Sequence, residues 1–221
     1  TYAEGLAWRA PQFGPTFADR MKRSTNVVFG QVLNINGQRV QISVAKTIKG
    51  ATAETAWISG FKKLEYGPVE DPRQLLNPEK DYILFLAGAL SGNVPANATP
   101  ISVVVPVDHG KVKVSLLAPV FPDYQHDYDF DFFVRYLQNL ANYQNGQEIE
   151  ATFITQLKES LEREAANPES KEAAVYLTLL RQFGVAYDND AVLFKMFDSK
   201  DVSARVLALH ALADVAKSLR K

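Results

Sequence analysis

The densest group of side chains that could carry chemistry is an acidic run at residues 123–131, which reads Asp-Tyr-Gln-His-Asp-Tyr-Asp-Phe-Asp. In an extended chain Asp127, Asp129 and Asp131 share one face, because successive side chains of a strand alternate. Grouped carboxylates are ligands that a hard cation such as calcium prefers, and paired carboxylates also perform acid–base catalysis. These three acids and His126 are therefore candidate binding residues.

The residues around this run favour a simpler interpretation. A calcium loop also needs a glycine after the third acid and a glutamate further on, whereas Phe132 and Phe133 follow here. The simpler interpretation is an interdomain linker whose aromatic residues pack and whose last acid, Asp131, caps the next helix. We expect no bound metal and no cofactor, with metal binding or hydrolysis by the acids as open alternatives.

Other residues that catalysis uses are sparse. The chain has no cysteine, which excludes disulfides, thiolate nucleophiles and cysteine-ligated metals. Its three histidines are far apart in the sequence, and no phosphate loop, nucleophile elbow or zinc-protease motif is present. We therefore expect a protein that is not an enzyme and has no catalytic residues.

Two aromatic residues are candidates for a binding groove, Trp57 on an expected strand and Tyr66 in a long loop. OB-like barrels bind ligands on such surfaces, although the core is the more ordinary place for a tryptophan on a strand. The net charge is −1, so we expect no nucleic acid as partner. No apolar run approaches the roughly 18–20 residues of a membrane span.

The first half of the chain has the pattern of an antiparallel sheet. Residues 27–35 and 38–47 are expected strands around Asn36-Gly37, a strong hairpin signal. Residues 81–88 are apolar on both faces and are therefore expected inside the sheet. Pro106 has no N–H to donate, so its strand is expected at an edge. The remaining strands are expected at 54–61, 101–107 and 111–117.

Helical periodicity replaces the strand pattern after about residue 130. Helices are expected over 131–144, 148–166, 169–183, 189–197 and 201–220. The charge balance changes nearby, since residues 1–122 hold 13 Lys and Arg against 9 Asp and Glu, whereas residues 123–221 hold 11 against 16. We therefore expect an α+β chain with a β domain over 1–122 and an α-helical domain over 123–221.

Three segments in order carry a resemblance. They are Asn26-Val-Val-Phe-Gly-Gln-Val32, then Ile42-Ser-Val-Ala-Lys-Thr-Ile-Lys-Gly50, then Asp81-Tyr-Ile-Leu-Phe-Leu-Ala-Gly88. In this order they resemble the netrin-module and tissue-inhibitor-of-metalloproteinases family over about residues 24–120. The resemblance implies an antiparallel OB-like β-barrel.

The same comparison limits what carries over. The metalloproteinase inhibitors place an N-terminal cysteine on the zinc of their target and brace the domain with disulfides. This chain has Thr1 at that end and no cysteine. The resemblance therefore implies the barrel fold but not the N-terminal segment that inhibits the target enzyme.

The C-terminal half carries a second resemblance. Asp201-Val-Ser-Ala-Arg-Val-Leu-Ala-Leu-His-Ala-Leu212 is similar to the second helix of a HEAT repeat, and Glu169-Ser-Lys-Glu-Ala-Ala-Val-Tyr-Leu-Thr-Leu-Leu180, 32 residues earlier, aligns with it. The resemblance implies two HEAT- or armadillo-type hairpins. A solenoid usually needs at least three repeats, so these two require another surface to pack against.

These observations predict a non-enzymatic protein that binds another protein. An inhibitor or regulator of an extracellular hydrolase, and a hydrolase or metal-binding protein that uses residues 123–131, are the alternatives. The chain starts at Thr1 rather than Met, which fits an N-terminus set by processing or by the choice of expressed segment. Removal of a signal peptide would make the protein secreted or periplasmic.

Overall fold

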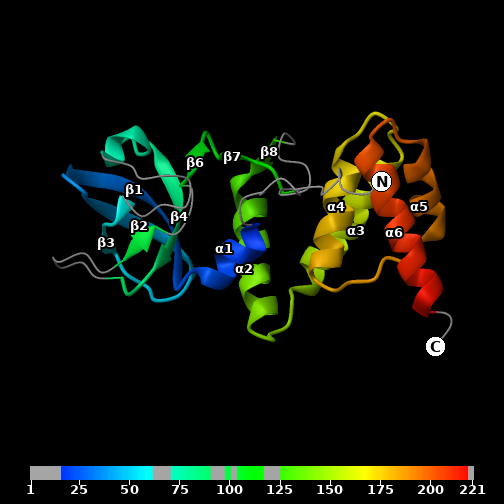
Figure 1. The fold of residues 1–221 in the computed structure, drawn as a ribbon, viewed down its shortest axis with the longest axis horizontal. Coiled ribbons are helices and arrows are strands. Elements are labelled where there is room, and N and C mark those ends of the chain that lie inside the picture. Colours follow the sequence, from blue (N-terminus) through cyan, green and yellow to red (C-terminus); the bar gives the residue numbers. More distant parts are fainter. Residues whose placement is uncertain (1–15, 62–70, 91–97, 101–103, 117–124, 219–221) are drawn as a thin grey trace, which may run out of the picture. The chain divides into compact units, whose positions relative to one another are not determined.

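The computed structural model describes residues 16–61, 71–90, 98–100, 104–116 and 125–218 (Figure 1). The chain divides into two compact units, residues 1–138 and 139–221. This division falls inside helix α2 (Phe130–Gln144), whereas the composition shift in the sequence lies near residue 122. The fold is α+β as expected, with an antiparallel sheet followed by helices.

The first unit is built around one sheet. Its described elements precede α2 and comprise α1 (Phe17–Arg23), β1 (Asn26–Asn36), β2 (Arg39–Lys49), β3 (Thr55–Ile58), the 3₁₀ turn η2 (Pro72–Gln74), β4 (Asp81–Ala87), β5 (Thr99–Pro100), β6 (Val105–Asp108), β7 (Lys111–Val114) and β8 (His126–Asp129). The strand order is β3-β2-β1-β4-β6-β7-β8, and β5 pairs with β4. Each of these pairings is antiparallel.

The first hairpin forms as expected, with its turn one residue later. Asn36 pairs with Arg39, so the two loop residues are Gly37 and Gln38. Gly37 has a φ of +57°, a conformation that glycine adopts without steric cost. Val40 and Ile42 are buried on one face of β2, as the alternation predicts.

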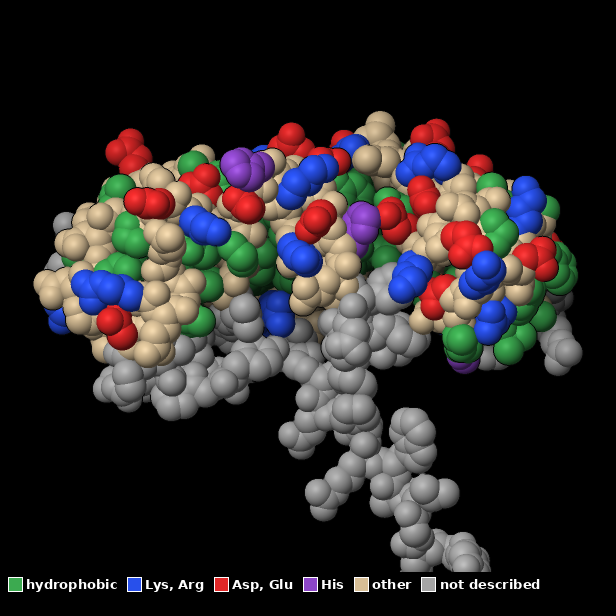
Figure 2. All heavy atoms as spheres, turned by 90° about the horizontal axis from the view of Figure 1, so that it is seen from above, with side chains coloured by type: hydrophobic (Ala, Val, Ile, Leu, Met, Phe, Trp, Pro, Cys, Tyr) green, Lys and Arg blue, Asp and Glu red, His purple; other side chains and the backbone are tan. Residues whose placement is uncertain are grey.

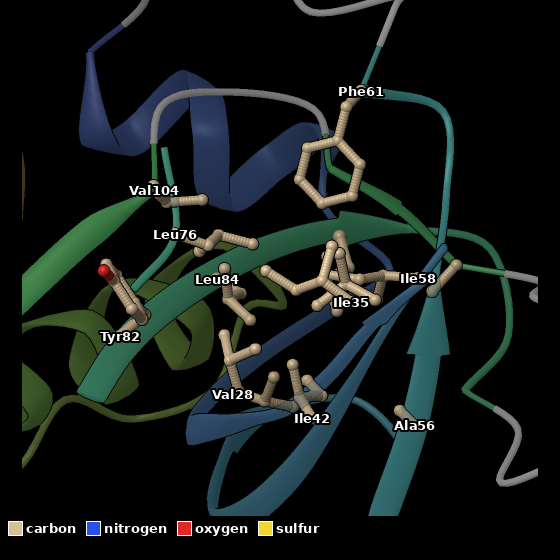
Figure 3. Packing of buried hydrophobic residues seen from close by; sticks show 14 residues of the cluster. Val28, Ile35, Ile42, Ala56, Ile58, Phe61, Leu76, Tyr82, Leu84 and Val104 are labelled. Carbon is tan, nitrogen blue, oxygen red and sulfur yellow. The ribbon is translucent and has the colours of Figure 1, made fainter. Parts of the chain in front are cut away.

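The apolar strand β4 lies between β1 and β6 and is buried on both faces, as expected. Ile83 and Phe85 point to one face, where the ring of Phe17 of α1 lies 5.9 Å from Phe85 and 5.2 Å from Phe133 of α2. The opposite face joins a core cluster shared with β1, β2 and β3 (Figure 3). That cluster consists of Val28, Val32, Ile35, Val40, Ile42, Ala56, Ile58, Phe61, Leu76, Tyr82, Leu84, Leu86, Ala98 and Val104.

The expectation of an edge strand at Pro106 is wrong. β6 lies between β4 and β7, and Pro106 is opposite Tyr82 of β4. The proline is tolerated because the β6–β7 ladder covers only Val107 and Asp108, so no hydrogen bond to β7 is required of Pro106.

A buried asparagine holds one corner of this sheet. The side-chain amide of Asn26 donates to the carbonyl oxygen of Gly88 at 2.7 Å, and its Oδ1 accepts from the backbone N–H of Ala51 at 2.9 Å. Nearby, Lys49 Nζ donates to the carbonyl oxygen of Met21 at 2.5 Å, and partial burial lowers the pKa of Lys49. The corner thus joins the start of β1 to the ends of β2 and β4.

The second unit consists of helices. After the last turns of α2 come α3 (Ala151–Ala165), α4 (Glu172–Gln182), α5 (Asp190–Lys195), the 3₁₀ turn η3 (Met196–Asp198) and α6 (Val202–Ser218). α4 packs against α3 and α6, and α5 packs against α6. Gly184, with a φ of +67°, ends α4 through hydrogen bonds from Gly184 N–H to Arg181 O and from Val185 N–H to Leu180 O.

Candidate functional site

The middle of the acidic run, residues 126–129, is part of the sheet, so the interpretation of these residues as a linker is wrong. His126–Asp129 form β8, which pairs with β7 in the register Lys111 to Asp129 and Lys113 to Asp127. Each acid therefore lies opposite a lysine, and opposite charges on facing strands stabilise the pairing. The lysines belong to β7, and the acidic sequence alone does not indicate that it pairs with this strand.

The four candidate residues of this run do not converge on one point. Asp127 and Asp129 are exposed on one face of β8, as expected. Tyr128 is buried on the other face, with the ring of His126 4.8 Å away. Asp131 is exposed in the first turn of α2, which begins at Phe130, so Asp131 is inside the helix and does not cap it.

The chemistry open to this strand is limited. Lys111 Nζ lies 2.6 Å from Asp129 Oδ1, and both side chains are largely exposed. Among the described residues no three His, Cys, Asp or Glu side chains group closely enough to hold a metal ion. Asp127 and Asp129 stand along an exposed strand face, which offers water and no enclosed substrate position.

The two aromatic candidates lie elsewhere. Trp57 is half-buried on β3, and its neighbours Ala56 and Ile58 are the residues that enter the core cluster. A core position for Trp57 is therefore wrong, because strand alternation places it on the other face. Tyr66 lies outside the described residues. β3 and β8 are at opposite ends of the strand order, so the sheet does not bring Trp57 beside the acidic strand.

A small cavity of about 210 Å³ lies between α1 and strands β6 and β7. Arg20 and Lys113 both line it, beside an apolar wall that includes Phe17 and Val105. Two cations beside an apolar wall suit a small anionic group. The guanidinium of Arg20 also lies 4.9 Å from the ring centre of Phe17, so this cation already has a packing role.

The most unusual surface is on the last helix, α6. Ala204, Ala208 and Ala211 are buried on its inner side. On the opposite side, Val202, Val206 and Leu209 are 59%, 44% and 60% exposed, and Ala213 is exposed as well. We call Val202, Val206, Leu209 and Ala213 the α6 outer face. The apolar face of a helix is normally turned toward the core, so this exposed apolar face is an exception.

The helix before it, α5, also exposes an apolar side chain. Phe194 of α5 is 60% exposed, although phenylalanine is among the residues most often buried. On the face of the molecule seen in Figure 2, coloured side chains of both charge signs are interspersed, with hydrophobic ones between them. The α6 outer face itself contains no charged residue.

The 32-residue repeat allows part of this face to be compared with the corresponding positions of α4. By that offset, Val206 and Leu209 of α6 correspond to Ala174 and Leu177 of α4. Ala174 and Leu177 are completely buried, and Leu177 lines a 450 Å³ groove together with Ala211 of α6. The other two positions differ, because Val202 corresponds to Ser170, which precedes α4, and Ala213 corresponds to Arg181, which is exposed. Only the middle of the face is therefore buried on α4. Sequence reasoning aligned the two helices but did not predict which outer face would be left exposed.

Comparison with known proteins adds no family to this description. No protein-family model matches the chain, and no match is found among curated proteins. None of the helices in the described ranges combines the length and apolarity needed to cross a bilayer. The function is therefore inferred from the geometry of the residues themselves.

Proposed function

We propose that this protein is a non-enzymatic protein-binding protein whose helical unit binds another protein chain through the α6 outer face. The single observation that carries the proposal is the row of apolar side chains on α6, in which Val202, Val206 and Leu209 are 59%, 44% and 60% exposed. An apolar outer face indicates a surface that is covered in use.

The spacing of this face favours a helix as the covering element. Successive members are four, three and four residues apart, which is the heptad spacing of helix-to-helix packing. Valine, leucine and alanine side chains at these positions form the ridges between which a second helix packs. The covering element is therefore an apolar helix face of a protein, and neither an extended peptide nor a charged polymer fits as well.

We infer that the first unit is an OB-like barrel of the netrin type. Support comes from two contacts beyond the main strand order. Ser59 N–H donates to Ala98 O at 2.9 Å at the end of β3, and the next residues, β5, pair with Leu86 and Ala87 of β4. One short segment thus contacts both β3 and β4, as a closing strand would. The corner at Asn26, which joins the start of β1 to the ends of β2 and β4, is consistent with the resemblance as well.

We infer that the second unit is a short HEAT-like stack and that the protein is exported. The stack is supported by the repeated helical pairs and by the 32-residue correspondence of buried faces. Export is consistent with the netrin-type resemblance. The hydrolase alternative gains no support from the exposed acids of β8, and the inhibitor alternative rests on the resemblance alone.

Photo-crosslinking tests the proposed function. A photoreactive amino acid replaces Leu209 in the full chain, and the matched control carries it at Leu33 of β1, which is 51% exposed. In extract from the producing cells or their surroundings, we expect one defined protein adduct at position 209, and no such adduct at position 33. Equal, diffuse labelling at both positions would contradict a binding role for the α6 outer face.

A further inference from the structure

The cavity between α1 and strands β6 and β7 has walls that other contacts hold in place. α1 begins with a capping box, in which Thr16 Oγ1 accepts from Asp19 N–H at 3.0 Å and Asp19 Oδ2 accepts from Thr16 N–H at 2.9 Å. Phe17, the apolar wall on the helix side, packs against the rings of Phe85 and Phe133. On the opposite wall, β6 is held between β4 and β7. The cavity is therefore formed before any ligand binds, which lowers the cost of binding.

The charged side chains that line this cavity are positive. Arg20 and Lys113 line it, and none of the described lining residues is Asp or Glu. The acid next to Arg20 in the sequence is Asp19, whose carboxylate already accepts two hydrogen bonds from Thr16. The cavity therefore presents two cationic groups to an occupant, and such groups form their strongest hydrogen bonds with anions.

The two lysines of β7 differ in what they contact. Lys111 and Lys113 lie opposite Asp129 and Asp127 in the same ladder. Lys111 Nζ lies 2.6 Å from Asp129 Oδ1, whereas Lys113 and Asp127 form no ion pair in the part of the chain that the structure describes. Lys113 lines the cavity and Lys111 does not. The Lys113 ammonium is therefore available to an anion in the cavity.

Arg20 lies at the boundary between the charged and the apolar parts of the lining. Its guanidinium carbon is 4.9 Å from the ring centre of Phe17. A guanidinium that lies over a ring uses its face for the ring and directs its N–H groups along its edge, where a planar carboxylate accepts two of them. Arg20 is therefore placed as a ligand with a carboxylate beside an apolar group requires.

The size of the cavity and its apolar wall define the class of ligand. The volume of 210 Å³ corresponds to about seven water molecules at about 30 Å³ each, which suits a molecule of roughly seven to ten non-hydrogen atoms. Val105 and Val114 line the cavity with Phe17. Inorganic phosphate would lose hydration against this wall and has no apolar part to place there. A carboxylate joined to a ring or a short hydrocarbon chain satisfies both parts of the lining.

We infer that this cavity binds a small organic carboxylate, with the anionic end of the ligand at Arg20 and Lys113 and its apolar part against Phe17 and Val105. The site belongs to the first unit. It goes beyond the proposed function and does not depend on the binding role of the α6 outer face.

Titration of the full chain with benzoate, followed by the NMR signals of the backbone amides, tests this inference. Benzoate is the probe because it joins a carboxylate to a ring. We expect a dissociation constant of about 0.1–10 mM, with shifts of amides in β6 and β7 and no shifts in α6. Benzyl alcohol has the ring without the charge, and inorganic phosphate has the charge without the ring. Each of them should bind at least about tenfold more weakly than benzoate.

Three variants assign the binding to the lining residues. Arg20→Gln should weaken benzoate binding at least about tenfold, because it removes charge-assisted hydrogen bonds. Lys113→Gln should weaken it about two- to fivefold, because the charge of an exposed lysine is screened by solvent. Lys111→Gln is the matched control and should leave binding unchanged. Both lysines are exposed, so these two variants decide the question even if Arg20→Gln fails to fold.

Several results would overturn the inference. The first is the absence of amide shifts at benzoate concentrations up to about 50 mM, well above the expected dissociation constant. Equal binding of benzyl alcohol or of phosphate would do the same, and so would equal effects of Lys111→Gln and Lys113→Gln. None of these results changes what crosslinks at position 209, so the proposed function stands or fails separately.

Discussion

Asn26 offers the sharpest test of how the first unit is held together. Its side chain makes two hydrogen bonds, to Gly88 O at 2.7 Å and from Ala51 N–H at 2.9 Å, and it is almost completely buried. Asn26→Ala removes both bonds. At about 0.5–1.5 kcal/mol for each bond, the free energy of unfolding of this unit should fall by about 1–3 kcal/mol.

Asn26→Asp separates the two bonds. The carboxylate still accepts from Ala51 N–H, but it faces the oxygen of Gly88 with no proton to donate. At neutral pH this variant should therefore be less stable than Asn26→Ala. Burial and the facing carbonyl should raise the pKa of the new carboxyl in the folded state, so its stability should decrease as pH rises above about 4, where the unfolded carboxyl ionises.

Tryptophan fluorescence during urea unfolding measures the stability of the first unit, which contains Asn26. The chain has two tryptophans, Trp8 and Trp57, and neither is in the helical unit. In a Trp8→Phe background, Trp57 on β3 reports the sheet. Asn34→Ala, an exposed asparagine on the same strand, is the control and should change stability by less than about 0.5 kcal/mol. Equal losses for Asn26→Ala and Asn34→Ala would refute the role assigned to the corner.

Three further predictions concern other parts of the chain. Gly30→Ala would place a Cβ 1.8 Å from Ser43 O, so the free energy of unfolding, measured by Trp57 fluorescence, should fall by at least about 3 kcal/mol. Gly37→Ala has open space around the new Cβ but a positive φ, so it should lower the free energy of unfolding by about 1–2 kcal/mol. Burial raises the pKa of Tyr176 to about 12 and raises that of Tyr187 further still. The helical unit should therefore lose stability as pH rises above about 10, where the tyrosines of the unfolded chain ionise. Unfolding followed by helical circular dichroism should show a weaker pH dependence of stability in Tyr187→Phe. The exposed pair of Lys111 and Asp129 should contribute less than about 1 kcal/mol to the free energy of unfolding. The melting temperature of Asp129→Ala should not change when millimolar calcium is added.

Much of the sheet could be predicted from the sequence because its signals are local. Alternation at Val40 and Ile42 gave the buried face of β2, and the continuous apolar run of β4 gave its interior position. The acidic strand β8 could not be predicted in the same way, because nothing in its own sequence indicates that it pairs with β7. The position of β6 was missed for a similar reason, since Pro106 can lie inside a sheet where the ladder on one side stops before it.

The candidate site shows a different limit. The apolar residues of α6 are visible in the sequence on every side of the helix, and helical periodicity is therefore weak there. Only the structure separates Ala208, which packs inward, from Leu209, which is exposed. Three-dimensional packing, and not residue type, distinguishes a core position from a binding surface on such a helix.

Photo-crosslinking at Leu209 tests the binding role of the α6 outer face most directly, because Leu209 is 60% exposed in the middle of that face. The matched control is Leu33 of β1, which is 51% exposed. We predict one defined protein adduct at position 209 and none at position 33. Equal, diffuse labelling at both positions would contradict the binding role.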